Sequence, residues 1–181
     1  PGDPLIYRVS EEINYNNGNH DRFALSGFPL APSLQEHIPS IDAYCRISYS
    51  GSPVLAWLDE ESFSVDNFHY VDTNFLEFFE YPVIYGNPKT ALNKPEKAVI
   101  DKETALRLFQ KENALGESLR VGSRNFVISA VIDTKAINSH LDPHILIPNT
   151  NYPNATVEAY NRDWTRMANY TYIRFMQQPD M

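Results

Sequence analysis

Residues 68–140 decide the fold, because they carry three patterned segments in order: VDTNFLEFF (71–79), AVIDKETALRLF (98–109) and GESLRVGSRNFVISAVID (116–133). In the first segment, Phe75, Phe78 and Phe79 recur at helical spacing, so their rings share one face of a short helix. Three aromatic rings on one face bury a large apolar area. The segment therefore predicts an aromatic helix that packs against a core.

Both predicted helices start at a residue that can cap them. Asp72 or Thr73 is suited to cap the aromatic helix, and Asp101 is suited to cap the helix that follows the apolar strand of the second segment. The third segment alternates apolar and polar residues on both sides of a tight turn at Gly122 and Ser123, which predicts a hairpin. No step of the series brings a nucleophile, a base and metal ligands together. These residues are therefore interpreted as structural residues that shape the fold, and not as catalytic residues.

The flanking segments extend the same mixed pattern. Alternating apolar residues predict further strands at 5–13, 41–49, 62–71 and 170–175. A short helix is expected between the first two, after Pro29 and before Pro39, and these two strands are expected to be parallel neighbours. Residues 145–147, between Pro143 and Pro148, predict an edge strand. The chain is therefore expected to adopt an α+β fold.

The composition excludes several classes of partner. The chain has 181 residues, 43% of them hydrophobic, which suffices to bury a core without disulfides or metals. A net charge of -8 and a pI near 5.0 argue against nucleic acid and anionic lipid, since both require clustered Lys and Arg. The single Cys45 cannot form an internal disulfide. No apolar run approaches the length of a membrane span, and the chain is expected to be a fragment of a longer protein.

Catalytic chemistry has little support in the sequence. His140, Asp142 and His144 are weak candidates for a metal site, but Pro143 disfavours the helix that would place both histidines on one face. No serine lies in a G-x-S-x-G or S-x-x-K setting. No catalytic residue, bound cofactor or metal is therefore assigned. A metal-dependent hydrolase built on the three candidate residues stays as one alternative.

Contacts with a partner are expected at two kinds of position. The tip of the predicted hairpin, at Gly122, Ser123 and Arg124, is expected to project into solvent. Trp57 and Trp164 belong to an aromatic set that is rich enough to line a groove for a peptide or a carbohydrate, although core packing competes with that interpretation. A second alternative is a ligand-sensing extracytoplasmic domain of a signalling receptor, which would need a closed polar pocket.

The order of these segments resembles the extracytoplasmic core domain of MacB/FtsX-type ABC transporter permeases. That family characteristically carries V-D-x-x-F-x-x-x-F, a glycine, an apolar strand, an A-x-x-L-F-G helix end, an I-G pair and V-x-G-V-x-x-D. Similar positions in this chain are Val71, Asp72, Phe75, Phe79, Gly86, Val99, Ile100, Ala105, Leu108, Phe109, Leu115, Gly116, 127–131 and Asp133, joined by 138–140 and 170–173. Gln110 and Ala130 depart from the pattern, since the family usually has glycine at both positions.

The resemblance implies a domain inserted between transmembrane helices of a permease in the bacterial inner membrane, on the periplasmic side. It implies a porter-like lobe of strand-helix-strand units at 1–67 and 150–181, and an inserted mixed lobe with the hairpin at 68–149. Such a domain is non-catalytic and couples helix motion to export or to the action of a partner protein, while a separate cytoplasmic ATPase uses ATP. The implied partners are the helices of its own chain, the ATPase, a second permease in a possible dimer, and an exported substrate or an extracytoplasmic protein.

Overall fold

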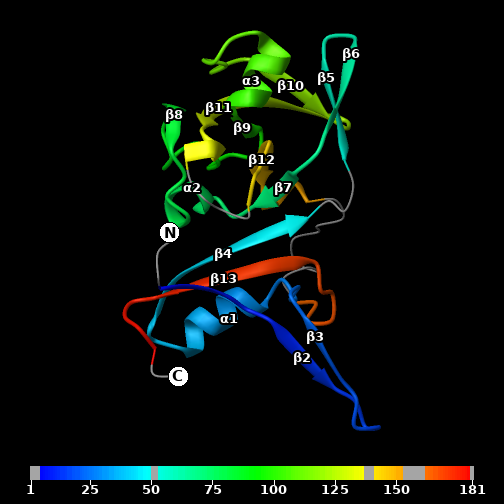
Figure 1. Ribbon diagram of the computed structural model, residues 1–181, viewed down its shortest axis with the longest axis vertical. Helices are drawn as coiled ribbons and strands as arrows, with labels where there is room; N and C mark the ends of the chain where they lie inside the picture. The colour runs from blue at the N-terminus through cyan, green and yellow to red at the C-terminus, as the bar shows by residue number, and fades with distance from the viewer. Residues whose placement is uncertain (1–4, 50–52, 137–140, 153–161, 180–181) are drawn as a thin grey trace.

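The computed structural model describes residues 5–49, 53–136, 141–152 and 162–179 (Figure 1). Its helices are α1 (Leu30–His37), α2 (Phe75–Phe78) and α3 (Lys102–Phe109), with 3-10 turns η1 (Thr134–Ala136) and η2 (Asn149–Asn151). Its strands are β1 (Ile6–Arg8), β2 (Glu11–Asn14), β3 (His20–Phe23), β4 (Ile41–Tyr49), β5 (Val54–Leu58), β6 (Glu61–Val65), β7 (Phe68–Val71), β8 (Val83–Gly86), β9 (Lys97–Asp101), β10 (Ser118–Val121), β11 (Arg124–Ile132), β12 (Ile145–Pro148) and β13 (Asn169–Phe175). None of the described helices is long and apolar enough to cross a bilayer. The fold is α+β, as predicted.

One mixed sheet holds most of the strands, in the order β1-β13-β4-β7-β12-β9-β11-β10-β5-β6, and β8 pairs with β11 beside that path. β2 and β3 form a separate hairpin that extends from the body (Figure 1). We call β1–β4, α1 and β13 the lower half, and β5–β12, α2 and α3 the upper half, as they are drawn in Figure 1. The two halves meet where β4 pairs with β7.

The central strands of the upper half are buried on both faces. Ala105 and Leu108 of α3 belong to the apolar cluster on one face, and the aromatic residues of α2 belong to the cluster on the other. Along β9, Ile100 packs into the first cluster and Val99 into the second. Strands buried on both faces read as continuous apolar runs. This explains why the sequence of β9 shows no alternation.

Several predicted elements are confirmed by the structure. Asp101 caps α3, since its side chain accepts a hydrogen bond from the backbone N–H of Thr104 at 3.1 Å. β10 and β11 form the predicted hairpin, and Gly122 in its turn has a positive φ of 59°. α1 follows Pro29, and β13 returns to pair with β4 along the lower half.

Four predictions about the strands are wrong. Residues 5–13 form two strands, β1 and β2, instead of one. β13 lies between β1 and β4, so these two strands are not neighbours. Residues 62–71 break into β6 and β7 because Asn67 takes a left-handed backbone with φ 50°, which asparagine tolerates better than most residues. β12 is not an edge strand, since it lies between β7 and β9 and all four of its residues are buried.

Three strands have no counterpart among the predicted elements: β3, β5 and β8. β8 pairs with β11. β5 forms a hairpin with β6 on one side and pairs with β10 on the other. Ala56 of β5 and Val65 of β6 are fully buried and complete the apolar cluster around Leu119 and Phe126. The predicted first lobe includes β5 and β6, whereas the structure places them in the upper half. The division into two lobes stays a prediction.

Candidate functional site

The junction between the two halves is narrow. β4 pairs with β13 from Ile41 to Ser48, but it pairs with β7 only at Ile47, Ser48 and Tyr49. β7 ends at Val71, where the chain turns away toward α2, so within the described part of the chain no strand lies on that side of the first half of β4. An opening therefore forms between β4 and the start of α2, at the boundary between the halves.

An arginine-carboxylate pair closes the sheet where the two strands part. The guanidinium of Arg46 donates from Nε to Asp72 Oδ2 and from Nη2 to Asp72 Oδ1, both at 2.9 Å. The backbones join the same contact, because Arg46 N–H donates to Asp72 Oδ2 at 2.9 Å and Asp72 N–H donates to Arg46 O at 3.1 Å. The side chains are only 11% and 13% exposed. We call this pair the clasp.

Neighbouring side chains fix both partners of the clasp. Arg46 Nη1 donates to Phe28 O at 3.0 Å, and its guanidinium carbon lies 3.8 Å from the centre of the Phe28 ring. Asn149 of η2 donates from Nδ2 to Asp72 Oδ1 at 3.1 Å, and its Oδ1 accepts from the Ser48 hydroxyl at 3.0 Å. The clasp thus links β4, β7, η2 and the segment before α1. Bidentate pairing of this kind fixes geometry as well as charge.

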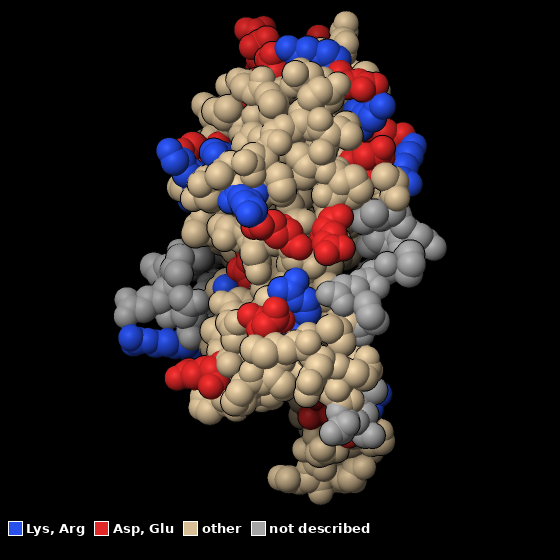
Figure 2. All heavy atoms as spheres, turned by 90° about the vertical axis from the view of Figure 1, so that its left-hand side faces the viewer, with Lys and Arg blue, Asp and Glu red and all other residues tan. Residues whose placement is uncertain are grey.

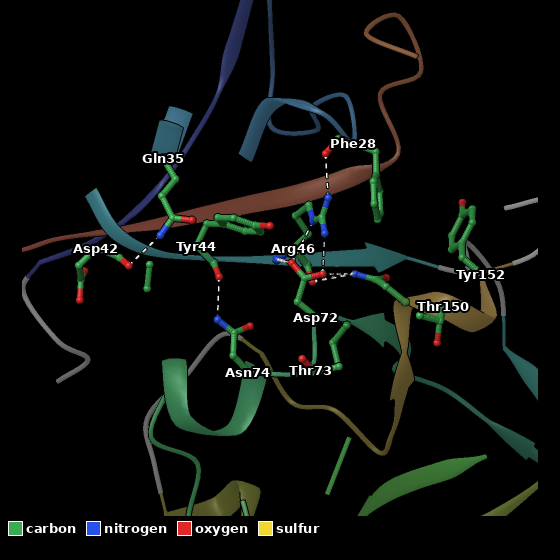
Figure 3. A pocket seen from close by; sticks show the side chains of 13 residues that line it. Phe28, Gln35, Asp42, Tyr44, Arg46, Asp72, Thr73, Asn74, Thr150 and Tyr152 are labelled. Atoms are coloured by element: carbon green, nitrogen blue, oxygen red, sulfur yellow. Dashed lines mark hydrogen bonds and ion pairs between the residues drawn. The ribbon is translucent and has the colours of Figure 1, made fainter. Parts of the chain in front are cut away.

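A cleft of about 530 Å³ opens beside the clasp (Figure 3). Its polar lining is largely occupied with the protein itself. Gln35 Nε2 donates to Asp42 O and Asn74 Nδ2 donates to Tyr44 O, both at 2.8 Å. The Asp42 carboxylate accepts hydrogen bonds from Arg174, which hold the pKa of that carboxyl below its usual value. Both carboxylates that line the cleft are therefore paired with arginines.

Aromatic rings supply most of the apolar lining of the cleft. Phe28 lies against the clasp, and the Tyr44 ring and the Tyr152 ring border the opening (Figure 3). Burial raises the pKa of the Tyr44 phenol above its usual value, with further smaller charge effects. The adjoining face carries interspersed acidic and basic groups without a continuous basic patch (Figure 2). A site with paired charges and aromatic walls suits an uncharged ligand better than an ion.

The opposite face of the junction has a smaller cavity of about 240 Å³, which His69 and Asp142 help to line. His69 points into it from β7. Burial, and to a smaller extent the charge of the neighbouring His144, lower the pKa of His69 to about 4. The folded protein therefore holds His69 neutral at a pH where an unfolded chain would protonate it.

We expect this buried histidine to make the protein acid-sensitive. The folded pKa is about 4 and the unfolded pKa is about 6.5, so the stabilisation is complete above pH ~6.5 and is lost as the pH falls toward ~4. The loss amounts to about 2–3 kcal/mol. Urea unfolding from pH 7 to 4 should show a flatter pH profile for His69→Gln than for the unsubstituted protein. Replacing the exposed His20 should leave the profile unchanged, and equal profiles for all three proteins would refute this role.

The residues predicted to meet a partner do not form one site. Trp57 packs against Arg120 of the neighbouring strand β10, whose guanidinium carbon lies 4.7 Å from the centre of the Trp57 ring. The nearby hairpin tip is exposed at Gly122, Ser123 and Arg124, and Arg124 donates to Asn151 at 2.7 Å. Trp164 is 54% exposed and lies in the lower half, where its backbone passes close to Gly27. Contact of these residues with a partner stays a prediction.

The candidate metal residues are not assembled in the described part of the chain. His140 lies outside the described residues. Asp142 is exposed, whereas His144 is half-buried and close enough to His69 to affect its pKa. Within residues 5–49, 53–136, 141–152 and 162–179, no three His, Cys, Asp or Glu side chains are placed to hold one ion.

Sequence reasoning missed the clasp. The sequence predicts Asp72 or Thr73 as the cap of α2, but the N-cap position is Asn74, which makes no side-chain capping bond. The Asp72 carboxylate binds Arg46 instead. One signal was available. Arg46 is a lone cation within the apolar stretch 43–47 of a predicted strand, and a buried cation needs a partner. The identity of that partner depends on the register of β4 and β7.

Comparisons with known proteins agree with one another. A family model described as the MacB-like periplasmic core domain matches residues 5–179. A domain of a Porphyromonas gingivalis protein described as a permease superimposes with a TM-score of 0.82 at 20% identity, covering 97% of this chain and 75% of that one. No curated protein matches the chain.

Two further solved structures share the fold at lower similarity. The periplasmic region of MacB from Actinobacillus actinomycetemcomitans gives a TM-score of 0.62 at 14% identity, covering 86% of this chain and 68% of that one. The extracellular domain of YknZ, a noncanonic ABC-type transporter from Gram-positive bacteria, gives 0.62 at 12% identity, covering 95% and 84%. The family match favours the permease interpretation over the receptor and hydrolase alternatives.

Proposed function

The chain belongs to the family of MacB-like periplasmic core domains, and from this membership we propose that it transmits force for an ABC transporter permease of the bacterial cytoplasmic membrane. In this proposal the transmembrane helices of the same polypeptide move when a cytoplasmic ATPase binds and hydrolyses ATP. The domain passes that movement to an exported substrate or to an extracytoplasmic partner protein. It performs no chemistry itself.

The position of the chain ends supports this proposal. Phe175 N–H donates to Leu5 O at 3.1 Å, and β1 pairs with β13, so both ends of the described chain lie side by side in the lower half (Figure 1). Adjacent ends are what insertion between two membrane helices requires. Helix movement would therefore enter through the lower half. The upper half would receive it across the junction of β4 and β7.

The observation that carries the proposal is the construction of that junction. Only three register positions pair β4 with β7. Beyond them, the side chains of the clasp and one backbone hydrogen bond, from Asp72 N–H to Arg46 O, hold the two strands together. A short ladder closed by side chains is a place where two parts of a sheet can change their angle, because side-chain contacts can be remade without unfolding a strand. The shared apolar cluster around Ile47 and Val71 keeps the two halves together.

The chemistry of the cleft also favours a mechanical or binding role. General acid-base catalysis needs a carboxylate or histidine within reach of substrate and free to exchange a proton. Asp72 is bound by Arg46, and Asp42 is bound by Arg174. The ATPase that this proposal requires would be a separate subunit or domain, and a dimer of permeases is the expected assembly.

A redox-controlled lock tests the proposal in the full-length permease with its ATPase. Arg46 and Asp72 extend the β4–β7 register and face each other, so Arg46→Cys with Asp72→Cys should form a disulfide. The buried Cys45 is first replaced by alanine. In proteoliposomes, the oxidised protein is expected to hydrolyse ATP but to lose transport, or partner activation, by at least about tenfold, and reduction should restore it.

The matched control places a disulfide away from the junction. Glu12 and Arg22 are register partners in the exposed β2–β3 hairpin, so Glu12→Cys with Arg22→Cys makes a cross-link within the lower half. Oxidation of this control should leave transport unchanged. Full transport by the oxidised junction variant would rule out a moving junction.

A further inference from the structure

The first half of β4 is a strand edge that no other strand of the described residues covers. β13 occupies one side of it, but β7 reaches only Ile47 on the other side. Asp72 N–H donates to Arg46 O across that side, so the alternation of an antiparallel strand turns the backbone groups of Asp42 and Tyr44 the same way. Figure 3 shows the carbonyls of both residues directed toward side chains that line the cleft.

Side-chain amides occupy this open edge. Gln35 Nε2 donates to Asp42 O and Asn74 Nδ2 donates to Tyr44 O, each at 2.8 Å. The two carbonyls are two residues apart in a strand and so lie about 6.7 Å apart. Two amide N–H groups at that spacing imitate the donors of a neighbouring strand. Gln35 comes from α1 and Asn74 from the start of α2, so the two imitating groups belong to opposite halves.

The cleft has the size and chemistry to hold the strand that is imitated. Its volume of about 530 Å³ falls within the ~300–1,000 Å³ typical of ligand sites. Its charged groups are already paired, Arg46 with Asp72 and Asp42 with Arg174. The rings of Tyr44 and Tyr152 offer apolar surface with a polar tip. A charged occupant would find no unpaired counter-charge among these residues, whereas an uncharged occupant needs none.

We propose that this cleft binds an extended, uncharged segment of a second polypeptide. The segment pairs with the open edge of β4, in the strand position that β7 occupies up to Asp72. Backbone N–H groups of the segment donate to Asp42 O and Tyr44 O, displacing the amides of Gln35 and Asn74. The N–H of Tyr44 faces the same side and donates to the segment. The site does not depend on the force-transmitting role proposed above, because binding is measured on the isolated chain without an ATPase.

The test uses a defined probe, the peptide acetyl-Ser-Val-Ser-Tyr-Ser-Val-amide, titrated into ¹⁵N-labelled protein. A saturable shift of the Tyr44 amide signal is expected, with a Kd on the order of 0.1–1 mM. Two versions of the peptide, N-methylated at the odd or at the even residues, keep the sequence but lose donors on one face. One version should lose most of its affinity while the other keeps it.

A pair of variants separates strand addition from ordinary pocket binding. Asn74→Ala with Gln35→Ala removes the competing amides and should tighten binding about fivefold, because the peptide no longer displaces an internal hydrogen bond. Asn125→Ala, on the exposed face of β11, is the control and should change nothing. Weaker binding by the double variant would contradict strand addition, as would equal affinity of both methylated peptides.

Two other results would also overturn the proposal. Absence of a saturable shift with both the unsubstituted protein and the double variant would show that the edge does not accept such a segment. Dimerisation of the double variant, measured by light scattering, would assign the edge to a second copy of this chain. The peptide titration does not depend on transport by the disulfide-locked permease. Failure of the peptide-binding proposal can therefore be distinguished from failure of the force-transmission proposal.

Discussion

Replacing Asp72 with alanine is expected to lower the free energy of unfolding by about 3–5 kcal/mol. The substitution leaves the guanidinium of Arg46 buried without its counter-charge, since Arg46 as a whole is only 9% exposed. It also removes the acceptor of the Arg46 backbone N–H and of Asn149 Nδ2. Chemical denaturation followed by circular dichroism measures the loss, which should appear as a lower midpoint with an unchanged slope.

Two controls show whether the orphaned charge causes that loss. Arg46→Met with Asp72→Asn removes both charges but keeps an oxygen acceptor, so it should recover about half of the loss or more. Asp42→Ala breaks an ion pair that is about one-third exposed on each side, and it should cost less than about 1 kcal/mol. A double variant as unstable as Asp72→Ala alone would contradict the charge argument.

Replacing Gly86 with alanine is expected to cost about 3 kcal/mol or more. Gly86 ends β8 with φ +100°, a conformation that L side chains rarely adopt. A Cβ built on it would lie 2.4 Å from Ser129 O and 2.9 Å from Ala130 Cβ. The backbone of β11 at Ser129 and Ala130 cannot move away without breaking the β8–β11 pairing. Neither the steric clash nor the backbone strain can therefore be relieved locally.

Gly116 provides the matched control for the Gly86 substitution. Its φ of +81° is also positive, but a Cβ there would meet nothing within 4 Å. Gly116→Ala should therefore cost only the conformational term of about 1–2 kcal/mol. Thermal or urea unfolding of both variants gives the comparison. Equal losses would mean that the close approach of β8 and β11 has no energetic consequence.

The elements with a strong local signal could be predicted from the sequence. Asp101 before an amphipathic helix and Gly122–Ser123 within alternating segments act over a few residues, and both predictions hold. β8 was missed because its partner, β11, lies far along the chain. β5 was missed although it pairs with its sequence neighbour β6, and its remaining contact is with the distant β10. Local propensity carries little information about such pairings.

The departures from the family pattern show how context overrides propensity. Gln110 stands where the family usually has glycine, and the structure places it in the left-handed conformation with φ 56° at the end of α3. The conformation is kept although glutamine adopts it at a cost. Ala130, the second departure, lies against Gly86 and fills the space that a side chain there would need.

The candidate site could not be derived from the sequence in the same way. Arg46 and Asp72 are 26 positions apart, and Asn149 lies another 77 beyond Asp72. Their meeting depends on the register of β4 with β7 and on the central position of β12, which precedes η2. The sequence predicted β12 as an edge strand, so it could not bring Asn149 to the clasp. The open edge of β4 likewise exists only because β7 is short.

The distance between the two halves in the working transporter tests the central claim most directly. Spin labels at Glu36 on α1 and Arg107 on α3, both exposed, report across the junction in the full-length permease with its ATPase and with Cys45 replaced by alanine. Pulsed electron resonance is expected to give different distance distributions without nucleotide and with ATP trapped. A control pair at Arg107 and Ser62, both in the upper half, should give one distribution in both states. Superimposable distributions for the pair across the junction would contradict the account.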